Sequence, residues 1–258
     1  MFNQSGFITK NTAINELFSI ENEFIQSMRS LMLSLNGDWS DIARQYASGT
    51  DPNSRLFGYI TPSDRKGRYE LIFSYEGLLK ASKFQLPFFD KIGAVLSQVF
   101  EESEKLFEEV LEGILEESFK PIKENLLRNS YIIIKYIYYV DNVGAMINHP
   151  HLDNSILSIV WDECGYYTDN KLVVTKFSEE KVYQRLDLKD LTRTPRNKSV
   201  VVPGLRLHHE FGLPFFASPH GVLPFLEGEE KERYSMVSLL TTSTPIEKEL
   251  VKIPGWVR

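Results

Sequence analysis

The chain has 258 residues, a length that allows one large domain or two small ones. Hydrophobic residues make up 42% and charged residues 25%, a globular mix that excludes a disordered, collagen-like or low-complexity chain. Acidic residues outnumber basic ones by 35 to 29, the net charge is -6, and no Lys/Arg run is present. This charge balance argues against nucleic acid or an anionic membrane surface as a partner.

The single cysteine, Cys164, excludes an intrachain disulfide and favours a reducing compartment such as the cytoplasm. The first residues lack the basic stretch and apolar core of a signal peptide. The longest apolar-rich run, Tyr131–Val140, is far shorter than the roughly 20 residues that span a bilayer. We therefore expect a soluble, cytoplasmic protein.

Residues 1–125 are predicted to be mostly helical. In Asn11–Leu35 the apolar residues recur mostly at intervals of three and four, and Asn36-Gly37 is a typical helix end. Asp51–Arg68 is rich in Pro, Gly, Ser and Asp, which predicts an ordered loop. Phe88–Leu115 carries an apolar stripe at helical spacing, with a Glu-rich opposite face that we expect to be solvated.

From Tyr131 onward the pattern changes to short β-branched and aromatic runs separated by Gly, Pro, Asn and Asp. Strands are predicted at 131–140, 155–161, 171–177, 199–203, 213–217 and 234–240. So many strands in so short a stretch suggest a sandwich or barrel packed against the helical half. The predicted fold class is α+β, with a helical region at 1–125 and a β core at 126–258 forming one integrated domain. A tail or short helix is expected from Pro245.

His151 and Asp153 form a His-x-Asp pair just before the predicted strand at 155–161. Residues i and i+2 of a strand point to the same face, so the imidazole and the carboxylate can bind one ion. A third ligand must come from elsewhere, and His220 in the segment ASPHGV is the candidate. Two histidines and one carboxylate leave open positions on the metal and are typical of non-haem Fe(II) oxygenases. Taken alone, a His-x-Asp pair favours a turn capped by the aspartate over a metal site.

Other histidines offer alternatives to this set. His149 precedes His151 by two residues, so HPHLD also allows these two histidines as the ligand pair, although the intervening proline favours His151 with Asp153. His208 and His209 are expected at the surface or in a groove. They therefore stay outside the predicted metal site.

Three further residues lie close to the motif. Cys164 is predicted to be a passive small residue in a turn. Trp161 and Tyr166 follow the motif and can either line the pocket or pack in the core.

Arg233 and Ser235 lie two residues apart in KERYSMVSLL, so on a strand they share a face. A guanidinium offers a bidentate, permanently charged contact to a carboxylate, and the hydroxyl adds a donor. If the pair is buried, it needs an anionic partner, because an unpaired buried cation is costly. The pair therefore predicts a carboxylate-binding site.

Together these motifs resemble those of a known family, the 2-oxoglutarate/Fe(II) oxygenases of the isopenicillin N synthase-like group. HLDNSILSIVWDECGYY resembles the family's His-x-Asp-x-Ser strand with its aliphatic run, acidic turn and glycine. SVVVPGLRLHHEFGLPFFASPHGV is similar to the segment leading to the distal histidine, and ERYSMVSLL to the Arg-x-Ser strand. Order and approximate spacing agree over about residues 131–240. The first half of the chain also resembles the family in its order of predicted elements, a Gly58-Tyr59 loop followed by a long helix.

The resemblance implies a double-stranded β-helix, or jelly roll, with iron at its mouth. His151, Asp153 and His220 would hold Fe(II), and Arg233 and Ser235 would bind the distal carboxylate of 2-oxoglutarate. The implied activity is hydroxylation of an unactivated C–H bond of a small organic molecule by dioxygen, with release of succinate and CO2. Desaturation or ring formation is also compatible with the family, whereas halogenation is disfavoured because related halogenases lack the carboxylate ligand.

The sequence departs from the family pattern in three places. The gap from His220 to Arg233 is longer than usual, which LPFLEGEEK can absorb as a longer hairpin turn. Gly221 stands where arginine is common. The family's Asn-x-Tyr element on the preceding strand has no clear match, so the second 2-oxoglutarate anchor can be any of three residues there: Lys135, Tyr136 or Tyr138.

Two alternative functions stay open. One is a catalytically silent β-helix protein that binds a ligand or a partner. The other is the same oxygenase chemistry on a peptide side chain.

Overall fold

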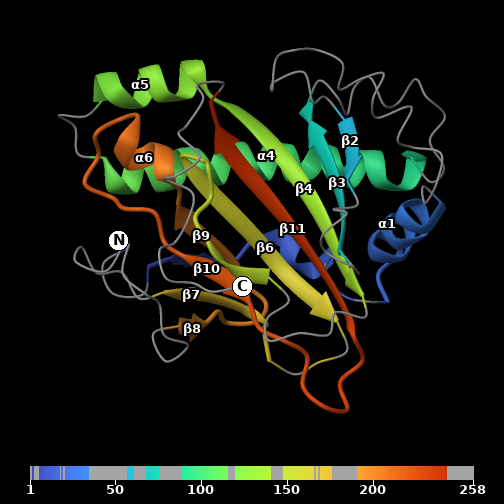
Figure 1. The fold of residues 1–258 in the computed structure, drawn as a ribbon. Helices are drawn as coiled ribbons and strands as arrows, with labels where there is room; N and C mark the ends of the chain where they lie inside the picture. The colour runs from blue at the N-terminus through green and yellow to red at the C-terminus, as the bar shows by residue number, and fades with distance from the viewer. Residues whose placement is uncertain are drawn as a thin grey trace.

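The computed structural model describes residues 2, 6–17, 19, 21–34, 57–60, 68–75, 89–115, 120–140, 148–165, 167, 169–175 and 191–242. These residues form a mixed α/β fold in which two antiparallel sheets are accompanied by helices (Figure 1). The helices are a 3-10 helix η1 (Ala13–Leu17), α1 (Glu23–Ser34), α4 (Phe89–Ile114), α5 (Lys120–Asn129) and α6 (Leu205–His209).

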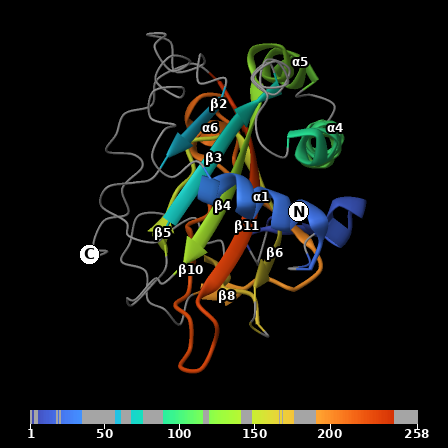
Figure 2. The ribbon, with the colours of Figure 1, turned by 90° about the vertical axis from the view of Figure 1, so that its right-hand side faces the viewer.

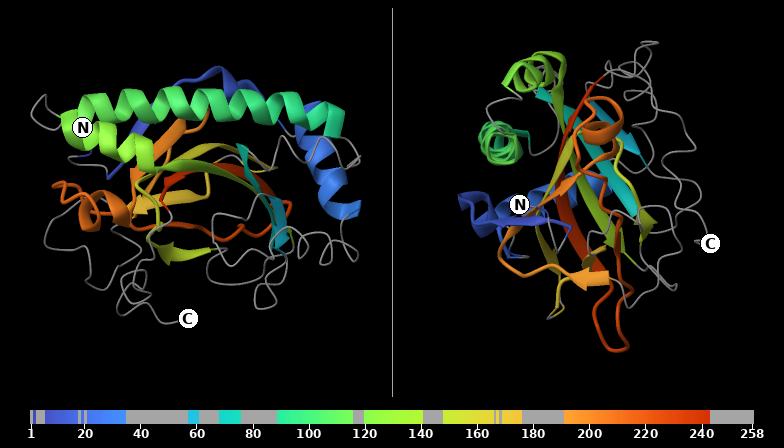
Figure 3. Two further views of the ribbon diagram at one scale, coloured as in Figure 1. Left: turned by 90° about the horizontal axis from the view of Figure 1, so that it is seen from above. Right: turned by 90° about the vertical axis from the view of Figure 1, so that its left-hand side faces the viewer.

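The larger sheet has seven strands. In spatial order they are β1 (Ile8–Lys10), β9 (Ser199–Pro203), β6 (Leu157–Gly165), β11 (Glu232–Thr241), β4 (Tyr131–Val140), β3 (Arg68–Ser74) and β2 (Phe57–Ile60). The smaller sheet has four strands in the order β5 (Asn148–His151), β10 (His220–Val222), β7 (Leu172–Thr175) and β8 (Leu191–Arg193). Helices α1 and α4 lie on one side of the large sheet, and β5 lies on the other (Figures 2 and 3).

Strands β4 and β11 occupy the middle of the large sheet and divide it into two faces. They pair along their whole length, from Glu232 opposite Val140 to Thr241 opposite Tyr131. Because side chains alternate along a strand, the even-numbered residues from 132 to 138 and from 234 to 240 lie on the face toward α4. The odd-numbered residues from 133 to 139 and from 233 to 239 lie on the opposite face, toward the small sheet.

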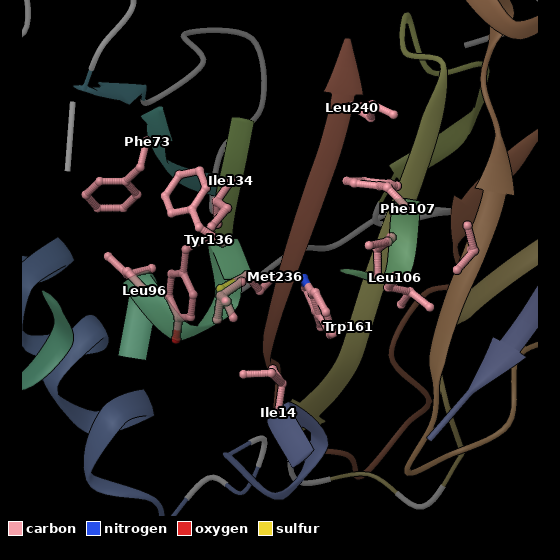
Figure 4. Close-up of a cluster of buried hydrophobic side chains, with 14 of the residues drawn as sticks. Ile14, Phe73, Leu96, Leu106, Phe107, Ile134, Tyr136, Trp161, Met236 and Leu240 are labelled. Carbon is pink, nitrogen blue, oxygen red and sulfur yellow. The ribbon is translucent and has the colours of Figure 1, made fainter. Parts of the chain in front are cut away.

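The face toward α4 carries the main hydrophobic core (Figure 4). The apolar stripe of the long helix supplies Leu96, Leu106 and Phe107, which are at most 4% exposed. Trp161 packs in the same core, and its indole N–H donates a hydrogen bond of 2.8 Å to the hydroxyl of Ser238. The predicted long helix is therefore confirmed, and its apolar stripe holds one face of the large sheet away from water.

The first half of the chain is not purely helical. Strands β1, β2 and β3 lie within 1–125 and all join the large sheet, two of them by pairing with strands of the second half. The prediction of a loop at Asp51–Arg68 is wrong at β2, which sits inside it. The prediction of a largely helical N-terminal half is thus not confirmed. The boundary at 125/126 and the single integrated domain stay predictions.

The predicted helix at Asn11–Leu35 is broken into η1 and α1. Asn22 caps the start of α1, because its side-chain carbonyl accepts a hydrogen bond of 2.9 Å from the backbone N–H of Phe24. Such a side-chain cap satisfies a backbone donor that the first helical turn leaves free. The position of Leu35 lies outside the described residues.

Three expectations for the second half are also wrong. No strand forms at 213–217. The N–H of Leu213 donates instead to the Leu207 carbonyl of α6, and the N–H of Ser218, just after the segment, donates to the Pro203 carbonyl of β9. The segment WDECG is no turn, since β6 continues through Gly165 and includes Cys164. The stretch after β10 is not a hairpin, because β10 and β11 belong to different sheets. The expected tail from Pro245 lies outside the described residues.

None of the helices in the described ranges is both long enough and apolar enough to cross a membrane.

Candidate metal centre and carboxylate pocket

Three side chains that can bind a metal converge beside the small sheet. The ligand atoms of His151, Asp153 and His220 all lie within 4.8 Å of one another. Nε2 of His220 is 3.4 Å from Oδ2 of Asp153, and Nε2 of His151 is 3.6 Å from Oδ1. Among the described residues, no other group of three or more His, Cys, Asp or Glu is gathered in this way. The arrangement can hold a divalent cation through two nitrogens and an oxygen.

The backbone brings the two histidines together by strand pairing. His151 is the last residue of β5 and lies directly opposite His220, the first residue of β10. Asp153 follows β5 and is not on a strand, so the expected strand geometry for the His-x-Asp pair is wrong although the two side chains meet. The loop that carries Asp153 is held by the N–H of Leu205, which donates to the Asp153 carbonyl at 3.0 Å.

The electrostatics favour a charged carboxylate at this point. Burial alone would raise the pKa of Asp153, but the charges of His220 and His151 and a hydrogen bond from Ser158 hold it well below its usual range. The Ser158 hydroxyl donates to Oδ2 of Asp153 at 2.6 Å. Burial lowers the pKa of His220, and Asp153 and the Ser218 carbonyl raise it by more. A metal cation can replace the proton in this cluster, because ligands bind metals in their deprotonated form.

A backbone carbonyl orients the ring of His220. Its Nδ1 lies 3.0 Å from the carbonyl oxygen of Ser218. Because a carbonyl only accepts, Nδ1 carries the proton and the neutral ring keeps its lone pair on Nε2, which faces Asp153. Contacts of this kind fix the tautomer of metal-binding histidines.

Position 221 requires glycine because β5 approaches it closely. A Cβ at this position would lie 2.9 Å from the carbonyl oxygen of Asn148 and 3.0 Å from the nitrogen of Pro150. Both neighbours are backbone atoms, so they cannot rotate away. The departure from the family pattern at this residue therefore has a local steric reason next to His220.

Arg233 and Ser235 line the same cavity as the three metal-binding side chains. Arg233 is 1% exposed, and its Nε donates to the buried carboxylate of Glu163. Its guanidinium also lies over the ring of Tyr139, 5.2 Å from the centroid. This ion pair raises the pKa of Arg233 although burial lowers it. The cation is thus fixed in position before any ligand binds.

One guanidinium nitrogen is left without a partner. Nη1 of Arg233 is buried, and it makes no hydrogen bond within the described part of the chain. The carboxylate of Glu163 is already engaged, because it also accepts hydrogen bonds from the backbone N–H groups of Lys171 and Leu172. A buried donor without an acceptor costs about 1–3 kcal/mol. An anion in the cavity would remove that cost.

The structure separates the three candidates for a second anchor. Lys135 lines the cavity. Tyr136 and Tyr138 belong to the core on the opposite face of the sheet, so neither can contact a ligand in this cavity. The sequence did not suggest Tyr139, which lines the cavity beside Arg233.

The remaining candidates lie elsewhere. His208 and His209 are on α6, where Nδ1 of His208 is 2.8 Å from the carbonyl oxygen of Leu213. Trp161 is in the core and not in the pocket. The side chain of His149 and all of Tyr166 lie outside the described residues.

Besides Tyr139, two more residues at the site escaped sequence reasoning, Glu163 and Ser158. Ser158 is visible in the sequence only as part of an aliphatic run, and its contact with Asp153 depends on the loop after β5. Glu163 lies on β6 opposite Ser235 of β11, and its pairing with Arg233 follows from strand register. The acidic stretch WDECG is the one available signal, and taken alone it is typical of a turn.

Comparisons with known proteins support the same fold. No protein-family model matches the chain, and no curated protein matches its sequence. Among solved structures, a protein from Shewanella oneidensis described as an oxygenase is 15% identical, with a TM-score of 0.62 over 96% of this chain and 86% of that one. JOX2 in complex with 2OG, Fe and JA is 16% identical, with a TM-score of 0.60 over 96% and 72%. A full-length Neurospora crassa protein in complex with alpha-KG and 5-formyluracil is 15% identical, with a TM-score of 0.57 over 96% and 81%.

The likeness to these structures is one of fold, since identity is near 15% throughout. The expected resemblance to 2-oxoglutarate/Fe(II) oxygenases is therefore confirmed at the level of architecture.

Proposed function

We propose that the protein is an Fe(II)- and 2-oxoglutarate-dependent oxygenase built on a double-stranded β-helix core, and that it hydroxylates an unactivated C–H bond of a small organic molecule. The observation that carries this proposal is the placement of two different sites in one cavity. The His151–Asp153–His220 cluster and the Arg233–Ser235 pair line the same space. A metal-binding protein without a keto acid would not need the second site.

The donor set fits Fe(II). His151, His220 and Asp153 would hold Fe(II) through two imidazole nitrogens and one carboxylate oxygen, which would leave positions on the metal for other ligands. When bound, an Fe(II)–2-oxoglutarate pair supplies oxidation by dioxygen with release of succinate and CO2. The carbonyl of Ser218 and the hydroxyl of Ser158 orient His220 and Asp153 for this task.

The co-substrate fits the second site. Its distal carboxylate would accept from the unpaired Nη1 of Arg233 and from the hydroxyl of Ser235. Glu163 is a positioning residue, since it binds Nε of the Arg233 guanidinium and leaves Nη1 free for the ligand. The low exposure of Arg233, at 1%, keeps water from competing for that carboxylate.

Two of the structures solved with small molecules, the Neurospora crassa protein with 5-formyluracil and JOX2 with JA, support a small-molecule substrate as the first choice. The same chemistry on a peptide side chain is the alternative. A silent binding protein is disfavoured, because binding alone gives no reason for a complete metal-ligand set beside an unpaired buried guanidinium.

Succinate release tests the proposal. Purified protein reconstituted with Fe(II) under anaerobic conditions should convert 2-oxoglutarate to succinate on exposure to air, slowly even without a primary substrate. Asp153→Ala should abolish this conversion, and His208→Ala should not, because only Asp153 belongs to the metal cluster. Conversion that is equal in the Asp153→Ala protein would refute the proposal.

A further inference from the structure

The loop of residues 223–231, which leads from β10 into β11 (orange-red in Figure 1), is fastened to the residue before β7. The N–H of Leu223 donates to the carbonyl of Lys171 at 2.8 Å. The ammonium of Lys171 pairs with the carboxylate of Glu229 at 2.5 Å. The same carboxylate accepts the N–H of Leu226 at 2.6 Å. One residue, Lys171, therefore holds this β10–β11 loop near both of its ends.

The ion pair that fastens the loop is largely withdrawn from water. The side chain of Lys171 is 1% exposed and that of Glu229 is 15% exposed. Replacing a buried ion pair by uncharged groups of similar shape is often neutral for stability, because the attraction does little more than offset the lost hydration. Stability alone therefore does not account for the pair, whereas fixing the loop in one position does.

Lys171 also connects the loop to the carboxylate that orients Arg233. The backbone N–H of Lys171 donates to one oxygen of Glu163, and the other oxygen of Glu163 accepts from Nε of Arg233. Lys171 thus contacts the loop through its carbonyl and ammonium groups, and the Arg233–Glu163 pair through its amide. A shift of Lys171 would displace the guanidinium.

Phe225 provides a second connection from the loop to the guanidinium. It packs against the small cluster formed by Ile137, Tyr139 and Val222. All three residues of that cluster line the cavity. The guanidinium of Arg233 lies over the ring of Tyr139. The loop therefore supports, from behind, the wall on which the guanidinium rests.

Resting on the proposed function, we propose that the β10–β11 loop forms the end support of the co-substrate site, and that Glu229 and Phe225 are positioning residues. They fix the point at which the guanidinium of Arg233 meets the distal carboxylate of 2-oxoglutarate. The distance from this point to the metal sets the length of the keto acid that can bind at both ends. A guanidinium held in place selects 2-oxoglutarate over 2-oxoadipate, which is one methylene longer.

Calorimetric titrations of the two keto acids into protein loaded with Mn(II) in place of Fe(II) test this inference without turnover. Wild type should prefer 2-oxoglutarate by about tenfold or more, the usual effect of one methylene in a closed site. Phe225→Ala and the double variant Lys171→Met/Glu229→Gln should each weaken 2-oxoglutarate by about tenfold, as for residues that orient a binding group, and should reduce the preference. The double variant leaves no buried charge alone and keeps an acceptor for Leu226. Phe225→Leu keeps more of the packing and should show a smaller loss, so it carries the test if Phe225→Ala does not fold.

Controls separate positioning from general damage. Glu227→Gln changes an exposed charge of the same loop and should leave both affinities as in wild type. Mn(II) affinity should be equal in all variants, although the loop directly follows the strand that carries His220. Loss of metal affinity together with 2-oxoglutarate affinity would show damage to β10 and overturn the positioning role.

The outcomes also separate this inference from the proposed function. An unchanged affinity for 2-oxoglutarate in the folded Phe225 variant and in the double variant would overturn the inference. So would an unchanged preference between the two keto acids. In both cases the oxygenase proposal stands. Failure of wild type to bind 2-oxoglutarate at all would contradict the proposed function itself.

Discussion

At the scale of single residues, the candidate site is held by short polar contacts that the sequence reveals only in part. Residue type and order along the chain were enough to select Asp153 and two of the five histidines, His151 and His220. Their local geometry was not, because Asp153 reaches the cluster from a loop whose position depends on Leu205, far along the chain. The choice between Lys135 and Tyr136 also needed the structure, since neighbouring strand residues face opposite sides of a sheet and the sequence does not say which side is the cavity.

Removal of one metal ligand should abolish iron binding. A residue that only orients a ligand already contributes about 10–100-fold to metal affinity, so we expect His220→Ala and Asp153→Ala each to weaken Fe(II) binding by more than about a hundredfold. Iron retained after anaerobic equilibrium dialysis measures this. His208→Ala is the matched control, because His208 contacts the carbonyl of Leu213 and not the cluster. Normal iron content in the His220→Ala protein would remove His220 from the ligand set.

The thiol of Cys164 should be unreactive in the folded protein. Burial raises its pKa to about 12, with the charge of Asp162 adding to the effect. The thiolate is the reactive form, and the raised pKa lowers its population at pH 8 by about a thousandfold relative to an ordinary thiol. Reaction with Ellman's reagent should therefore be slow in native protein and fast in urea. Fast reaction in both states would show that Cys164 is not buried.

At the scale of elements, the site depends on how closely two short strands approach. β5 and β10 pair through His151 and His220, and the register shifts between His220 and Val222. Neither strand was predicted, because NHPH and HGV lack the β-branched runs by which longer strands are recognised. The strands β2 and β3 were missed for a related reason: FGYI is embedded among turn-forming residues, and its pairing with β3 decides its conformation.

Gly221→Ala should disturb the site without unfolding the protein. The added methyl group would meet the backbone of Asn148 and Pro150, so β5 and β10 must move apart by a few tenths of an ångström or more. We expect Fe(II) affinity to fall by about ten- to a hundredfold, as for changes that misorient a ligand, with little change in the circular dichroism spectrum. Gly228→Ala in the loop before β11 is a useful contrast, because no atom lies within 4 Å of its added Cβ. It should leave metal affinity unchanged, although its positive φ of 86° costs some stability. Unaltered iron affinity in Gly221→Ala would show that the strand spacing does not control the site.

At the scale of the whole molecule, the large sheet separates a structural face from a functional one. The long helix α4 was predictable along its entire length, because its apolar stripe is set by local periodicity. The assignment of Trp161 to the core, and of Arg233 to the cavity, depends on which residues of each strand face the helix. That division follows from packing of distant elements, and no local pattern in the sequence contains it.

Truncation of the helix-facing core should lower stability while sparing the site. Leu96→Ala removes a fully buried side chain of α4 and should reduce the free energy of unfolding by about 2–5 kcal/mol. Glu104→Ala, exposed on the same helix, should change it by less than about 0.5 kcal/mol. Urea denaturation measures both. Equal stability of the two variants would contradict the packing of α4 against the sheet, and loss of iron affinity in folded Leu96→Ala would contradict the separation of the two faces.

The most direct test of the central claim is a titration of 2-oxoglutarate into the anaerobic Fe(II) protein, followed by the metal-to-ligand charge-transfer band of the chelate. Wild type should develop the band and saturate. Arg233→Ala should shift the midpoint by about ten- to a hundredfold or more, since a hydrogen bond to a charged group contributes about 1.5–3 kcal/mol. Arg233→Lys should recover only part of this loss, and Ser235→Ala should be milder, while Fe(II) content stays the same in all three. Absence of the band in iron-loaded wild type, or an unchanged midpoint in Arg233→Ala, would contradict the assignment of this cavity to Fe(II) and 2-oxoglutarate.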